Sequence, residues 1–113
     1  MTMITIGLDD GTVVCTPKSG NVRVNRRGTV TWQSRTKGQS FRLTFRYEPF
    51  QGMPPNLGDW PFSDTMPTAP STDWTDKFTA TAIDGDGVFK YLVEVRDASG
   101  GIARLDPIII IKN

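Results

Sequence analysis

Histidine is absent from this 113-residue sequence, and cysteine occurs only once, as Cys15. The lack of histidine excludes Ser-His and Cys-His nucleophile pairs and removes the usual ligands of zinc and copper. One cysteine cannot form an intrachain disulfide, so the sequence gives no support for an oxidising compartment. Because free cysteine is usually buried, we expect Cys15 in the core. We therefore expect neither a metal nor another cofactor.

Two further features are missing, namely an excess of one charge and a long apolar run. Thirteen basic and twelve acidic residues give a net charge of +1, which provides no broad basic field for nucleic acid. No apolar segment approaches the roughly 20 residues that span a bilayer, and the first residues do not resemble an export signal. We expect no nucleic-acid or membrane partner and a cytoplasmic location, although a mature fragment with an added methionine would look the same.

Alternation of apolar and polar residues dominates the sequence, and the length fits a single domain spanning residues 1–113. In the segment 41–47, four large apolar side chains alternate with Arg42, Thr44 and Arg46, which predicts a strand with one buried face. Similar runs occur around residues 4–8, 22–24, 30–32, 78–82, 89–95 and 102–112. Turn sequences rich in glycine and aspartate separate them. The pattern predicts an all-β, Greek-key sandwich or barrel.

The segment 48–75 interrupts this pattern, because residues 48–71 hold six of the eight prolines. Proline removes a ladder donor, so the segment is predicted to be a long loop, and its apolar residues favour folding over the sandwich. Its aromatic residues suggest a binding surface for a protein or a glycan. The alternative is that these rings pack inward. The candidate surface residues are Tyr47, Phe50, Trp60, Phe62 and Trp74.

Four consecutive isoleucines, 108–111, end the last predicted strand. An alternating strand with isoleucine at every position has two apolar faces, so something must cover the second face. The long loop is the simplest candidate, and a second copy of the chain is the alternative. The second alternative predicts homodimerisation through this strand edge, with Ile108 and Ile110 as candidate contact residues.

From Pro17 onward, the runs "TPKSGNVRVNRRGTVTWQS", "SFRLTF" and "GVFKYLVEV" resemble the cupredoxin family, the β-sandwich of plastocyanin and azurin. The resemblance implies a cupredoxin-like fold. It places Phe41 and Val93 where that family has a histidine and a cysteine copper ligand. A type 1 copper site needs a thiolate and two imidazoles, so copper-based electron transfer is excluded by composition.

Acidic residues suggest two further candidate sites, one for calcium binding and one for catalysis, and each pattern has a simpler structural explanation. Asp84-Gly-Asp-Gly87 has the start of a calcium-binding loop, but Val93 stands where the final glutamate would be, which favours a plain turn. Acidic residues in or beside the long loop would need to converge to catalyse hydrolysis, and solvated loop carboxylates are the simpler reading. These residues are Asp59, Asp64, Asp73 and Asp76.

The sequence as a whole predicts a non-catalytic, metal-free binding or structural module that contacts a partner through its aromatic loop or self-associates through its C-terminal strand. A carbohydrate-binding module that uses loop tryptophans is the alternative. On the strands, alternation places the charged residues Arg42, Glu94 and Arg96 on outer faces, where Glu94 can pair with an arginine across the sheet.

Overall fold

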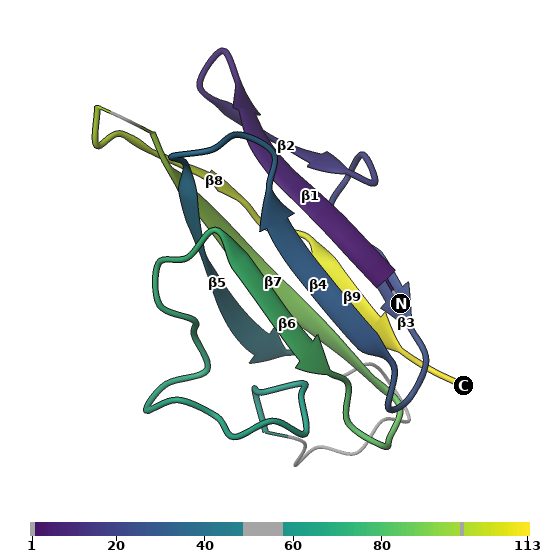
Figure 1. The fold of residues 1–113 in the computed structure, drawn as a ribbon. Coiled ribbons are helices and arrows are strands. Elements are labelled where there is room, and N and C mark those ends of the chain that lie inside the picture. The colour runs from purple at the N-terminus through teal and green to yellow at the C-terminus, as the bar shows by residue number, and fades with distance from the viewer. Residues whose placement is uncertain (1, 49–57, 98) are drawn as a thin grey trace.

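A computed structural model describes residues 2–48, 58–97 and 99–113, and shows strands joined by turns and loops (Figure 1). The residues in these ranges form nine strands, namely β1 (Thr2–Asp9), β2 (Thr12–Thr16), β3 (Val22–Val24), β4 (Thr29–Ser34), β5 (Ser40–Tyr47), β6 (Lys77–Thr81), β7 (Gly87–Arg96), β8 (Ile102–Leu105) and β9 (Ile108–Ile111). Among the described residues there is no helix long and apolar enough to cross a membrane.

The strands form two sheets that face each other (Figure 1). One sheet has four strands in the order β2-β1-β4-β6, and the other has the order β3-β9-β7-β5 with β8 also paired to β7. Within each sheet one neighbouring pair is parallel, β1 with β4 and β3 with β9. The predicted all-β sandwich is therefore confirmed.

Strand β5 shows why the sequence pattern produces a sandwich. Its alternate residues Phe41, Leu43 and Phe45 are at most 1% exposed and face the opposite sheet. Arg42 and Arg46 lie on the other face, as the alternation predicted. Each large side chain removed from water contributes about 1.5–3 kcal/mol, so this strand is a major source of stability.

Aromatic rings fill the centre of the sandwich around the fully buried Trp32. The indole lies edge-on to Phe45, Phe62 and Tyr91, with ring centroids 5.9, 5.9 and 5.5 Å away, respectively. Edge-to-face contacts of this kind add about 0.5–1.5 kcal/mol beyond area burial. The Tyr91 hydroxyl also donates a hydrogen bond to the Gly20 carbonyl, which ties β7 to the turn before β3. Burial raises the pKa of Tyr91.

The structure differs from the predicted strands at two places. The prediction did not include β2, whose Val13 and Cys15 face the core while Thr12 and Thr16 are exposed. The single predicted strand 102–112 is instead two strands interrupted at Pro107, whose carbonyl accepts a hydrogen bond from the Tyr91 amide. Proline has no amide proton to donate to the ladder, so the strand breaks there. The predicted burial of Cys15 is confirmed, and burial raises the pKa of its thiol.

The described part of the long loop, residues 58–76, leads into β6 along one side of the sandwich (Figure 1). Near its start, Phe62 forms a bridge with Ala82 beyond the end of β6. Near its end, Ser71 and Thr75 form bridges with Thr44 and Phe41 of β5. This segment therefore covers the outer edge of β5, which would otherwise be the free edge of the five-stranded sheet.

Candidate functional site

The structure places most of the predicted aromatic surface inside the protein. Tyr47 and Phe62 are only 8% and 3% exposed, so both are core residues, which corrects the prediction that they form a binding surface. Trp60 is half-buried and lies edge-on to Phe45 and Phe62, at centroid distances of 5.5 and 5.1 Å. Phe50 lies outside the described residues. An apolar loop must bury most of its rings against its own core, and these rings do so.

The last strand also differs from its predicted role. Strand β9 pairs with β3 on one side and β7 on the other, so it has no free edge for pairing with another chain. Ile109 and Ile111 are at most 1% exposed in the core. Ile108 and Ile110 face outward and are half-buried. The described part of the loop does not cover them, because it lies along β5, which is two strands away from β9.

Among the loop aromatics that the structure describes, Trp74 lies on the outside of the sandwich. The guanidinium carbons of Arg42 and Arg96 lie over its indole ring, 4.8 and 4.5 Å from the ring centroid. Arg42 belongs to β5 and Arg96 to β7, and the two strands are paired neighbours. Cation–π contacts at such distances are worth about 0.5–1 kcal/mol each at exposed sites. They hold the half-buried ring and both arginines in one arrangement.

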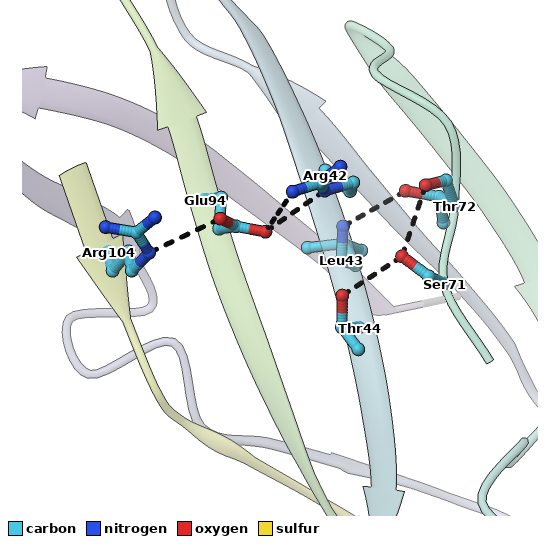
Figure 2. Close-up of polar contacts among 7 residues, drawn as sticks. All are labelled: Arg42, Leu43, Thr44, Ser71, Thr72, Glu94 and Arg104. Atoms are coloured by element: carbon cyan, nitrogen blue, oxygen red, sulfur yellow. Dashed lines mark hydrogen bonds and ion pairs between the residues drawn. The ribbon is translucent and has the colours of Figure 1, made fainter. Parts of the chain in front are cut away.

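A row of charged residues crosses the same face, as Figure 2 shows. Glu94 of β7 lies between Arg42 of β5 and Arg104 of β8. The Nε and Nη2 atoms of Arg42 donate to Glu94 Oε1 at 3.0 and 2.9 Å, and Arg104 Nε lies 3.3 Å from Glu94 Oε2. The predicted pairing of Glu94 with an arginine across the sheet is confirmed. The Glu94 side chain is only 7% exposed, beneath its two partners.

Hydrogen bonds fix the loop that carries Trp74 to the edge of β5 (Figure 2). The buried hydroxyl of Thr72 accepts a hydrogen bond from the Leu43 amide at 3.0 Å, and the Ser71 and Thr44 hydroxyls are 3.0 Å apart. Beyond them, Phe41 and Thr75 exchange two backbone hydrogen bonds of 2.8 and 2.9 Å. The tryptophan is therefore anchored on both sides along the chain, so its position follows that of the sheet.

These residues define a single surface, which we name the Trp74 patch: Arg42, Trp74, Arg96, Ile102 and Arg104. Ile102 joins it because it is opposite Arg96 in the β7–β8 ladder and is 43% exposed. Beside the patch is a hollow of about 260 Å³, lined by Arg42, Pro67, Thr68, Ala69, Ser71, Thr72, Asp73 and Trp74. The sequence indicated Trp74, Arg42 and Arg96 but not Ile102 or Arg104, because the contacts among these residues depend on the strand register.

The two aspartates of the suspected calcium loop are paired with arginines. Asp86 Oδ1 lies 2.8 Å from Arg26 Nε, and Asp84 Oδ1 lies 3.6 Å from Arg27 Nε. The hydrogen bond from Arg26 holds the pKa of Asp86 below its ordinary value. In the described part of the chain, no three acidic or cysteine side chains are grouped so that they could hold a metal ion. Ion pairs therefore join the turn at residues 84–87 to the turn that contains Arg26 and Arg27.

The four loop carboxylates lie in different surroundings and do not converge on one site. Asp59 accepts a hydrogen bond from the Tyr47 amide at 3.0 Å, and Asp64 accepts one from the Thr81 amide at 2.8 Å. Asp73 lines the hollow beside Trp74, whereas Asp76 lines a different hollow near the end of β4. Two of the four carboxylates thus hold backbone amides, and the other two lie in different depressions.

No model of a known protein family matches this chain, and no curated protein matches it in sequence.

Proposed function

We propose that this chain is a non-catalytic binding module that recognises a partner protein through the Trp74 patch. The observation that carries the proposal is the indole of Trp74, which lies on the outer sheet face with the guanidinium groups of Arg42 and Arg96 over its ring. Tryptophan and arginine are the residues that most often dominate the binding energy of protein interfaces.

The sheet makes this surface suitable for binding because it orders the side chains in advance. Arg42 is held by Glu94 and by the indole, so little rotamer freedom remains for it to lose when a partner binds. Ordering a long side chain at an interface costs about 0.5–1.5 kcal/mol, and a preordered one avoids most of that cost. The exposed apolar side chain of Ile102 adds area at the border of the patch.

The proposal includes a scaffold related to copper-free cupredoxins. Phe41 and Val93, which the resemblance places at two ligand positions, are both 0% exposed. Each lies on the core-facing side of its strand, in the paired strands β5 and β7. Their burial supports a sandwich in which apolar packing occupies the volume of an absent metal site.

A carbohydrate-binding module is the second candidate, favoured by the hollow beside Trp74. The hydroxyl-bearing residues Thr68, Ser71 and Thr72 line it together with the indole, a combination that suits a sugar ring. Two guanidinium groups already lie over the indole, which leaves less of the ring for stacking against a sugar. A protein partner therefore agrees better with the geometry.

The test uses immobilised wild-type chain to capture partners from an extract of its source, followed by calorimetry with each purified partner. We expect Trp74→Ala to weaken binding about 30-fold or more, the effect of losing one dominant interface residue. Met3→Ala is the control, because Met3 is 47% exposed on β1 of the other sheet. A partner whose affinity is unchanged by Trp74→Ala, or is lowered equally by both variants, would contradict the proposal.

A further inference from the structure

We infer that the partner presents an acidic polypeptide segment to the Trp74 patch. This inference rests on the proposed function and names the chemistry of the partner. It follows from how charge is distributed over the outer face of β5, β7 and β8, where the cations are exposed and the central anion is buried.

The burial of Glu94 makes the face more cationic than its composition suggests. One carboxylate, 7% exposed, lies between two guanidinium groups whose side chains are 38% exposed for Arg42 and 58% for Arg104. Arg42 and Arg104 together carry two positive charges against the one negative charge of Glu94, and the two arginines are the groups exposed to solvent. A carboxylate from a partner would approach this excess without displacing Glu94.

Arg96, which also lies over Trp74, adds a second charge that no carboxylate neutralises among the described residues. Its Nη2 atom donates to the Ser40 hydroxyl at 3.3 Å, and among the described residues it has no carboxylate within ion-pair distance. A guanidinium carries five N–H donors, so Arg96 retains donors for a bidentate bond with a carboxylate. Arg96 and Arg104 thus offer two separate points of attachment.

Other features of the face favour a polypeptide over a polysaccharide. The hollow of about 260 Å³ is smaller than the roughly 300–1,000 Å³ of typical small-ligand sites. Ile102 offers an apolar contact that complements a side chain better than a hydroxyl-rich sugar. Ser71 and Thr75 occupy the edge of β5, so the partner cannot add a strand there. At the β5 edge, recognition must therefore use the partner's side chains, with acidic ones opposite the arginines.

The experiment measures binding of fluorescently labelled poly-L-glutamate to the full chain by anisotropy, at about 25 mM salt where screening is weak. We expect saturable binding that falls about fivefold or more in the double variant Arg96→Gln/Arg104→Gln. The matched control is Lys37→Gln/Lys77→Gln, which removes the same charge at the separate hollow near the end of β4, and we expect it to change binding less than about twofold.

Three outcomes would overturn the acidic-polypeptide inference: no binding of poly-L-glutamate, equal losses in the two double variants, or tighter binding of polygalacturonate than of poly-L-glutamate. The last outcome would identify the ligand as an acidic polysaccharide. Failure of this inference is distinct from failure of the proposed function. A captured partner that needs Trp74 but contacts it through a neutral surface would overturn only the inference.

Discussion

Two aromatic residues near opposite ends of the described loop have different surroundings, since Phe62 lies in the core and Trp74 lies on the outer face of the five-stranded sheet. Phe62 forms a bridge with the buried Ala82, and residues opposite each other in a ladder point to the same side, so Phe62 enters the core. Thr75 forms a bridge with the inward-facing Phe41, so its neighbour Trp74 points outward, because side chains alternate along an extended chain. The register of these two bridges therefore determines that the Phe62 ring packs in the core and that the Trp74 ring lies on the surface.

The largest expected effect is at the inward end of the loop. Truncation in Phe62→Ala removes a ring that contacts Trp32, Phe45 and Trp60, and leaves a cavity in the centre of the sandwich. We expect the free energy of unfolding to fall by about 3–5 kcal/mol, measured by urea denaturation. A loss below about 1 kcal/mol would show that Phe62 is not a core residue.

The charged row should give the next largest effect. Glu94→Gln removes a buried carboxylate that two arginines share, and we expect a loss of about 1–2 kcal/mol, since both arginines are more than a third exposed. A double-mutant cycle with Arg42→Gln measures the coupling by denaturation. Zero coupling between the two positions would contradict the two hydrogen bonds from Arg42 to Glu94 Oε1.

The outward end should contribute much less to stability. Trp74→Ala loses two cation–π contacts and part of one half-buried ring, which we expect to cost about 1 kcal/mol in the same denaturation assay. Phe62→Ala serves as the comparison. Equal destabilisation of the two variants would contradict the conclusion that Phe62 packs in the core while Trp74 lies on the surface.

The smallest expected effect is on the pH dependence of stability and concerns Asp86, which is outside the long loop. The hydrogen bond from Arg26 lowers the pKa of Asp86 in the folded state, so this carboxylate stabilises the fold above its ordinary pKa of 3.8. That contribution is lost as pH falls from 3.8 through the lower folded pKa. Acid denaturation should therefore cost the wild type more stability than Asp86→Asn. Arg26→Gln should remove this difference, and an unchanged difference would exclude Arg26 as its cause.

The sequence was sufficient to predict the all-β sandwich and to predict which face of a strand such as β5 is buried. Alternation in β5 identified Phe41, Leu43 and Phe45 as core and Arg42 as an outer residue. It was not sufficient for β2, where a short run of threonine, valine and cysteine carries a weak signal. It also missed the break at Pro107, where four isoleucines suggested one continuous strand.

The candidate site was harder to predict, because it depends on contacts between distant segments. The sequence identified Trp74 as a candidate and placed Arg42 and Arg96 on outer faces. It could not give the register that sets Arg42 opposite Glu94, nor the bridge from Thr75 to Phe41 that turns Trp74 outward. A shift of one residue in either pairing would reverse the faces.

The most direct test of the presented tryptophan is quenching of its fluorescence by iodide and by caesium in the Trp60→Phe variant. Trp32 is 0% exposed, so quenching in this variant reports on Trp74. Guanidinium groups over the ring attract iodide and repel caesium, so we expect iodide to quench several-fold more strongly at low ionic strength. Equal quenching, or stronger quenching by caesium, would contradict a tryptophan presented among arginines.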